Sequence, residues 1–181
     1  MPARSRPATG GSSTATPTVS KATTGSHANC PRARDCPTFP PRLNRVGAHL
    51  TLFHHLPGEH LSTVVADLRA IRPEPFDLAV TGPRLLGRGV AIDLQSARLL
   101  ALHHALATRW HPWLTPQDRQ PFRPHITVQN KVDPAEARKL HATLGRTQHW
   151  PTALATGWSI WRYLGGPWSA ESEIAFTRQE D

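Results

Sequence analysis

The sequence predicts an α+β fold of two similar lobes, and three observations support this prediction. Two short segments, His49-Leu50-Thr51-Leu52 and His125-Ile126-Thr127-Val128, repeat the pattern His, apolar, Thr, apolar at a spacing of 76 residues. Each segment reads as a strand and is followed by a helix signal. The order strand, helix, strand, turn, strand then occurs twice along the chain, which is typical of an α+β fold with an internal repeat.

The N-terminal part of the chain has a different composition from the rest. Residues 1–40 are rich in Ser, Thr, Pro and Gly and are expected to form an irregular tail, whereas residues 41–181 are expected to form the domain. The first 45 residues carry seven Lys or Arg against one acid, and the remainder carries 14 against 12, which together give the net charge of +8. Because most of the basic excess lies in the tail, the domain itself does not predict a broad duplex-binding surface.

The first predicted lobe follows from alternating apolar residues and turn signals. The strand around His49 leads through Pro57-Gly58 into a helix, and Pro73 and Pro75 end that helix. Two further strands on either side of Gly87-Arg88-Gly89 predict a hairpin. The predicted elements are a strand at 46–53, a helix at 61–71 and strands at 76–81 and 90–94.

The second predicted lobe opens with a helix whose leucines recur at helical spacing. A proline-bearing loop then leads into the second His-x-Thr strand, and Asp133 with Pro134 predicts the start of the next helix. Gly165-Gly166 predicts the turn between the last two strands. The predicted elements are helices at 96–110 and 135–144, a loop at 112–124 and strands at 125–132, 152–164 and 168–176.

Targeting and membrane signals are missing from the sequence pattern. No apolar run approaches the ~20 residues of a membrane span, and the N-terminus lacks the apolar region of a secretory signal. Cys30 and Cys36 lie in the irregular stretch and predict no disulfide framework. These features predict a cytoplasmic protein with no membrane partner.

The two His-x-Thr segments point to acid–base chemistry. In a strand, His and Thr at alternate positions share one face, and the apolar residues between them can enter a core. Two such strands facing each other supply one imidazole to accept a proton, another to donate one, and hydroxyls that can bind phosphate oxygens. A third copy, His141-Ala142-Thr143, fits the same triplet, but it lies on a predicted helix, where positions i and i+2 do not face each other.

These residues resemble the 2H phosphoesterase superfamily, specifically the bacterial 2′-5′ RNA ligase-like (cyclic phosphodiesterase) proteins, over roughly residues 39–177. The resemblance implies a bilobal fold with a pseudo-twofold axis and a central cleft. It implies activity on 2′,3′-cyclic or 2′-5′ phosphodiester linkages of RNA or nucleotides, without a required metal or other cofactor. Such proteins usually begin with a strand and a helix before the first motif, and residues 1–38 show neither pattern. The stretches that carry the resemblance are Ala48-His49-Leu50-Thr51-Leu52-Phe53-His54, Phe122-Arg123-Pro124-His125-Ile126-Thr127-Val128, Leu86-Gly87-Arg88-Gly89-Val90, Leu114-Thr115-Pro116-Gln117-Asp118-Arg119-Gln120 and Trp161-Arg162-Tyr163.

The resemblance assigns the central roles to the four motif residues. His49 and His125 match the acid–base pair, and Thr51 and Thr127 match the hydroxyls that bind phosphate. An ordinary imidazole has a pKa near ~6.5, so both protonation states exist around neutral pH. The sequence leaves open which histidine is the base. Arg123, immediately before the second motif, is the best candidate for an additional phosphate contact.

Three further residues are candidate substrate contacts, each with a structural alternative. Phe53 could stack on a base or pack at the rim of the core. Lys131 could attract phosphate or lie at a solvated strand end, and Tyr163 could contact substrate or occupy a half-exposed sheet. The six Trp residues are expected in the core and cleft wall rather than in a platform for nucleic acid.

Two alternatives remain for the function of the chain. A zinc site at His54, His55 and His60 with His49 is disfavoured because no His-Glu-x-x-His helix or Cys pair accompanies them, so no metal is predicted. A non-catalytic module that binds RNA ends or nucleotides would keep the same cleft without turnover. In either case the expected partners are RNA ends or nucleotide cyclic phosphates, and a monomer is expected.

Overall fold

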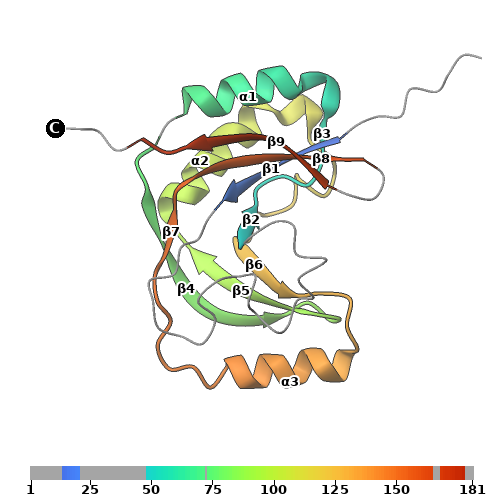
Figure 1. The fold of residues 1–181 in the computed structure, drawn as a ribbon, viewed down its shortest axis with the longest axis vertical. Helices are drawn as coiled ribbons and strands as arrows, with labels where there is room; N and C mark the ends of the chain where they lie inside the picture. Colours follow the sequence, from blue (N-terminus) through green and yellow to red (C-terminus); the bar gives the residue numbers. More distant parts are fainter. Residues whose placement is uncertain (1–13, 21–47, 72, 165–167, 178–181) are drawn as a thin grey trace, which may run out of the picture.

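The computed structural model describes residues 14–20, 48–71, 73–164 and 168–177. These residues form two antiparallel sheets with helices on their outer sides (Figure 1). The first sheet contains β1 (Thr14–Ser20), β2 (His49–Thr51), β3 (Leu56–Pro57), β8 (Gly157–Tyr163) and β9 (Trp168–Ala175). The second contains β4 (Phe76–Leu85), β5 (Val90–Gln95), β6 (His125–Gln129) and β7 (Ala153–Ala155). The helices are α1 (Leu61–Ala70), α2 (Ala97–Arg109) and α3 (Pro134–Leu144), with short 3-10 turns η1 (Gly58–His60) and η2 (His111–Trp113).

The two predicted lobes are present, but each is built from both halves of the sequence. The strand order β2-β1-β8-β9 places the first motif strand in the same sheet as the hairpin that follows the second motif. The order β6-β5-β4-β7 places the second motif strand beside the hairpin that follows the first. The halves of the chain therefore exchange hairpins, and the lobes are not successive segments.

The prediction of an irregular tail over residues 1–40 is wrong for residues 14–20. These residues form β1, which pairs with β2 on one side and with β8 on the other. The composition hid an alternation of Thr or Ser with apolar residues from Thr14 to Ser20, which is a strand pattern rich in β-branched residues. Pro17 also argued against a central strand, because proline cannot donate to the ladder. The rest of the predicted tail lies outside the described residues.

The single strand predicted at 152–164 is divided between the two sheets. β7 pairs with β4, whereas β8 pairs with β1 and β9. The change occurs at Thr156, which separates the two strands. Gly157 follows at a tight approach, because a Cβ there would lie 2.7 Å from the carbonyl oxygen of Ile174. This crossover links the lobes and could not be read from the local pattern.

The three predicted helices are confirmed, and two of them begin at a side-chain cap, of which Asp133 was predicted. The Ser96 side chain accepts a hydrogen bond from the Leu99 amide at the start of α2, and the Asp133 carboxylate accepts one from the Ala135 amide at the start of α3. The third His-x-Thr triplet lies on α3, as expected. No helix in the described part of the chain is long and apolar enough to cross a membrane.

A buried histidine occupies the core between α2 and the segment after the first motif. The ring of His103 stacks on Phe53 at 4.6 Å and on Phe122 at 3.9 Å between centroids. Burial lowers the pKa of His103 to about 4, although a hydrogen bond to the Leu52 backbone opposes the shift. The core therefore contains this imidazole in its neutral form.

The pKa of His103 predicts a loss of stability in mild acid. Since the folded-state pKa of about 4 lies below the ordinary 6.5, the unfolded chain binds more protons between these values. The stabilisation is complete above pH 6.5 and is lost as the pH falls towards 4, by about 3 kcal/mol. We expect His103→Phe, which keeps the stack, to flatten the pH dependence of urea unfolding in this window. His149→Phe, at an exposed histidine outside this core, is the control, and an equally steep profile in both variants would contradict the assignment.

Candidate active site

The two motif strands meet at the junction of the sheets. β2 is the edge strand of the first sheet and β6 is the edge strand of the second, and the two strands contact each other (Figure 1). The His-x-Thr segments, which are far apart in the sequence, are thereby brought side by side. The topology satisfies the first requirement of a two-histidine site.

Strand alternation in β2 separates the polar and apolar residues of the first motif. Leu50 is 2% exposed and belongs to the hydrophobic core, whereas His49 and Thr51 are half-buried. In the register with β1, His49 lies opposite Ser20, and Thr51 lies opposite Thr18. Direct cross-strand neighbours share a face. His49 and Thr51 therefore lie on the face of the first sheet opposite to its core.

The second motif lies on β6, where burial is even along the four motif residues. Ile126 packs against the core, and His125 and Thr127 are half-buried. In the register with β5, His125 lies opposite Asp93, and Thr127 lies opposite Ala91. The predicted alternation of burial is confirmed on β2, whereas on β6 all four residues of the motif are half-buried, so burial does not separate its two faces there.

The backbone before the second motif fixes the tautomer of His125. Its ring Nδ1 lies 2.8 Å from the carbonyl oxygen of Arg123. A carbonyl can only accept, so Nδ1 must carry the hydrogen and donate it. In the neutral ring, Nε2 then holds the lone pair and can accept a proton from a reacting group. In the protonated ring, the same Nε2 can donate one.

An ion pair lies beside His125 on the second sheet. The Arg84 Nε donates to both oxygens of Asp93, at 2.7 and 3.0 Å, and Asp93 is the cross-strand neighbour of His125. The Arg84 Nη2 is buried and has no hydrogen-bond partner among the described residues. Arg84 therefore retains donor capacity that a phosphate oxygen could use.

A groove of about 560 Å³ opens next to this ion pair. Arg123, the predicted phosphate contact, is exposed and lies in the groove wall with Arg84. The groove wall includes Thr81, Arg84, Asp93, Ser96, Phe122 and Arg123. Sequence reasoning missed Arg84 and Asp93, although their nearly symmetrical positions about the Gly87–Gly89 turn could have suggested a cross-strand pair.

The prediction that Phe53 contacts substrate is wrong. The residue is 0% exposed, and its ring lies between His103 and Trp110 in the core. The reason is that β2 ends at Thr51, so strand alternation no longer applies and both Leu52 and Phe53 turn inward. Only the alternative of a core contact remains.

Lys131 and Tyr163 do not lie beside the motif histidines. β6 ends at Gln129, and Lys131 follows in an exposed turn with a φ of 60°. His49 lies opposite Ser20 of β1, and Ser20 lies opposite Gly157 of β8. Tyr163 lies six residues further along β8 than Gly157. At the rise of a strand this is about 20 Å. Both residues lie towards the hairpin tips.

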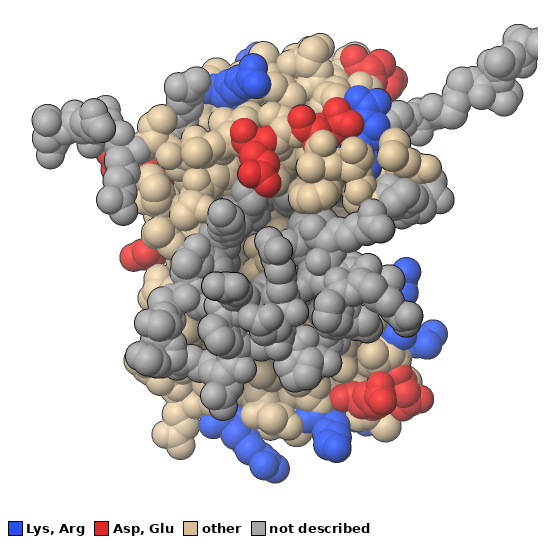
Figure 2. Space-filling view, in the orientation of Figure 1, with Lys and Arg blue, Asp and Glu red and all other residues tan. Residues whose placement is uncertain are grey.

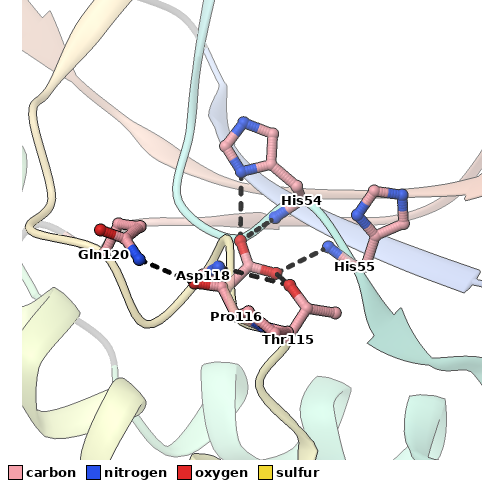
Figure 3. Close-up of polar contacts among 6 residues, drawn as sticks. All are labelled: His54, His55, Thr115, Pro116, Asp118 and Gln120. Carbon is pink, nitrogen blue, oxygen red and sulfur yellow. Dashed lines mark hydrogen bonds and ion pairs between the residues drawn. The ribbon is translucent and has the colours of Figure 1, made fainter.

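A buried carboxylate holds the segment that follows the first motif (Figure 3). Asp118 accepts hydrogen bonds from the backbone amides of His54 and His55 at 2.7 and 3.1 Å, from the His54 Nδ1 at 3.1 Å and from the Thr115 hydroxyl at 3.0 Å. Burial alone would raise the pKa of Asp118, but the bonds from His54, His55 and Thr115 outweigh it and lower the pKa. Asp118 therefore ties the residues after the first motif to the loop that leads to the second.

The histidines considered for zinc have other contacts. His54 pairs with Asp118, and the ring of His60 stacks on Trp113 at 4.1 Å. Within the described ranges, no three His, Cys, Asp or Glu side chains converge in a way that could hold a metal ion. His54 and His60 are therefore each held by a different neighbour, Asp118 and Trp113.

Comparisons with known proteins identify a family and several similar folds. The family model of the 2′-5′ RNA ligase superfamily matches residues 26–167. The structure is similar to that of E. coli LigT complexed with 3′-AMP, with 17% identity, coverage of 93% of this chain and 100% of that chain, and a TM-score of 0.56. It is also similar to a structure described as a phosphoesterase, with 16% identity, coverage of 93% and 100%, and a TM-score of 0.56. A third similar structure, TT0787 of Thermus thermophilus, has 18% identity, coverage of 79% and 83%, and a TM-score of 0.51. No curated protein matches the chain.

Proposed function

This chain belongs to the 2′-5′ RNA ligase superfamily, and on that premise we propose that it is a metal-independent phosphodiesterase. Its substrates are 2′,3′-cyclic phosphate or 2′-5′ linkages of RNA ends or nucleotides, and the reverse reaction gives 2′-5′ ligation. Membership in the superfamily supports a phosphoesterase-type enzyme. The observation that carries the finer proposal is the contact between β2 and β6, each with a His-x-Thr segment.

The proposed reaction is an in-line displacement at phosphorus. One neutral imidazole removes a proton from water, or from a ribose hydroxyl in the ligation, as that oxygen bonds to phosphorus, and the other imidazole, protonated, donates to the ribose oxygen that leaves. Each transfer contributes about 10²- to 10⁴-fold. Because the two histidines supply both transfers, the mechanism requires no metal-bound water. Reversing the reaction exchanges their roles, so either histidine can be the base.

The threonines and arginines serve the phosphate. Thr51 and Thr127 donate hydrogen bonds to the non-bridging oxygens, where negative charge increases in the transition state. Arg123 immediately precedes the second motif and lines the same groove as Arg84, so both arginines could attract one anion there. We assign Arg84 to this group in addition to the residues that the sequence predicts.

The proposal is tested with purified full-length protein and a 2′,3′-cyclic nucleotide in the presence of EDTA. We expect the protein to convert this substrate to a nucleoside monophosphate at a rate that the chelator does not change. Chromatography of the product measures the rate. Thr127→Val, which removes the hydroxyl but keeps the shape, should lower kcat about 100-fold. Thr127→Ser is the matched control and should retain most of the rate.

Two results would overturn the proposal. Loss of turnover on adding EDTA would show that a metal ion takes part. Nucleotide binding without any turnover would instead support the non-catalytic RNA-end-binding alternative.

A further inference from the structure

We propose that His103 is a positioning residue, and that its ring sets the separation of His49 and His125 by joining the segments next to the two motifs. This inference rests on the proposed function, because it assigns a task to the distance between the two imidazoles. His103 is only 9% exposed. It therefore acts on the reaction through the residues that it contacts and not through the substrate.

The two motif strands need such a link. β2 and β6 contact each other, but they belong to different sheets, and no ladder of backbone hydrogen bonds joins them among the described residues. Within one sheet, a ladder holds neighbouring strands about 4.8 Å apart. The spacing of β2 and β6 depends instead on side-chain packing and on the segments that adjoin each strand.

Arginine ion pairs do not supply this link. Each one that is formed between described residues stays within a hairpin or joins two helices, and none joins the two sheets. The pairs are Arg84–Asp93 between β4 and β5, Arg162–Glu171 between β8 and β9, and Arg109–Asp67 between α2 and α1. Figure 2 shows acidic and basic side chains in small separate groups on both lobes. Attraction between lobes of opposite charge therefore does not set the spacing.

Three parallel rings connect the two motif segments instead. The His103 ring lies between Phe53 and Phe122, with centroid distances of 4.6 and 3.9 Å and interplanar angles of 12° and 5°. Phe53 follows Thr51 by two residues, and Phe122 precedes His125 by three. These three rings, which we call the ring column, therefore join the end of β2 to the segment that leads into β6.

Both ends of the ring column are anchored. Phe53 is 0% exposed, and the edge of Trp110 packs against its ring at 5.3 Å. The ring of His103 also makes a hydrogen bond to the Leu52 backbone. Phe122 lies in the wall of the groove beside the second motif. The column thus extends from the core to the groove, and a shift of its central ring would reach both ends.

Helix α2 holds His103 in place relative to the second sheet. The helix begins directly after β5, and its cap Ser96 lies in the groove wall. β5 is the strand that pairs with β6. Because a packed helix moves as a rigid element, the ring keeps its position relative to β5 and β6. Its contact with Phe53 then transmits that position to the first motif.

A small change in the spacing of the motifs has a large effect on the rate. Both imidazoles must reach one phosphate at the same time, one at the attacking oxygen and one at the leaving oxygen. A misplacement of about 1 Å can lower the rate about 100-fold. The phosphate-binding groups of the second motif keep their own positions when the ring is lost. We therefore expect His103 to affect kcat more than KM.

Steady-state kinetics with a 2′,3′-cyclic nucleotide tests the ring column. His103→Leu keeps an apolar side chain but removes the ring, and it should lower kcat about 10-fold while KM changes less than about 2-fold. His103→Phe keeps three stacked rings and should retain most of the rate. Leu68→Ala, which opens a cavity on α1 outside the ring column, is the control. It should lower the urea midpoint but leave kcat unchanged.

A double-mutant cycle separates positioning from a general loss of stability. In His49→Ala one imidazole is already missing, so the distance between the two no longer matters. Adding His103→Leu to this variant should lower the residual kcat by less than about 2-fold. A further loss of about 10-fold would show that His103 acts independently of the histidine pair, and it would overturn the proposal.

Hydrogen exchange tests the same link without turnover. His103→Leu should raise amide exchange in residues 48–55 and 122–129 together, and exchange in α3 should stay unchanged. Exchange raised within α2 alone, or a wild-type kcat in the leucine variant, would overturn the positioning role even in an active enzyme. Joint loosening of both motif segments in a protein without turnover would uphold the link through His103 and overturn the phosphodiesterase.

Discussion

Replacing His125 or His49 by alanine is expected to lower kcat/KM for a 2′,3′-cyclic nucleotide by about 10²- to 10⁴-fold. In the proposed mechanism each substitution removes one of the two proton transfers, and no other imidazole in the described part of the chain lies on either motif strand. For His125, the hydrogen bond from Nδ1 to the Arg123 carbonyl already orients the ring. We therefore attribute the expected loss of activity to the missing proton transfer and not to a changed ring orientation. Initial rates measured under kcat/KM conditions check the prediction.

The pH–rate profile provides a second measurement of the same mechanism. One histidine must be neutral and the other protonated, so the wild-type profile of kcat/KM should be bell-shaped. Each alanine variant should lose one limb of the bell in its residual activity. A variant that keeps both limbs would show that the replaced histidine is not one of the pair.

The third His-x-Thr triplet supplies the matched control. His141→Ala removes a histidine from an identical triplet that lies on α3, away from the motif strands. We expect its kcat/KM to equal that of the wild type. Full activity in both His49→Ala and His125→Ala would rule out the two-histidine mechanism.

The second large effect is expected on stability. Asp118→Ala leaves two backbone amides, one hydroxyl and the His54 ring without their shared acceptor. Removing a buried charged acceptor of this kind costs about 3–5 kcal/mol in the free energy of unfolding. Urea unfolding followed by tryptophan fluorescence should show a lower midpoint. Because His54 and His55 follow the first motif closely, the variant should also have a lower kcat.

Two control variants define the origin of this effect. Asp118→Asn keeps one acceptor oxygen and should lose less stability than the alanine variant. Asp77→Ala removes an exposed carboxylate from β4 and should unfold at the wild-type midpoint. An unfolding midpoint for Asp118→Ala equal to that of the wild type would show that the four hydrogen bonds contribute nothing.

Asp118 also predicts acid sensitivity in a window different from that of His103. Its folded-state pKa lies below the ordinary value of 3.8, so the ionised form stabilises the fold. This contribution is complete above the unfolded pKa and is lost as the pH falls through the lower, folded value. The unfolding midpoint of the wild type should therefore fall further below about pH 4, and Asp118→Asn should lack that part of the decline.

The strands that carry the two His-x-Thr segments, and the candidate residues on them, could be identified from the amino-acid order alone. Strand alternation placed His49 and Thr51 on one face and Leu50 on the other, and Asp133 with Pro134 located the start of one helix. The same local signals separated the triplet at His141 from the two motif triplets. These inferences succeed because they depend on residues within a few positions of one another, where backbone geometry sets which side chains share a face.

Which strands pair with each other, in contrast, was decided by the three-dimensional structure. The exchange of hairpins between lobes, the insertion of β1 and the division of 152–164 are choices of pairing between distant segments, and such pairing leaves little local trace. The same reason explains the burial of Phe53, the Arg84–Asp93 pair and the position of Asp118. Each depends on a strand end, a register or a loop approach that is set by packing across the molecule. Local patterns therefore specify what the site is made of, and long-range strand pairing specifies how its parts are brought together.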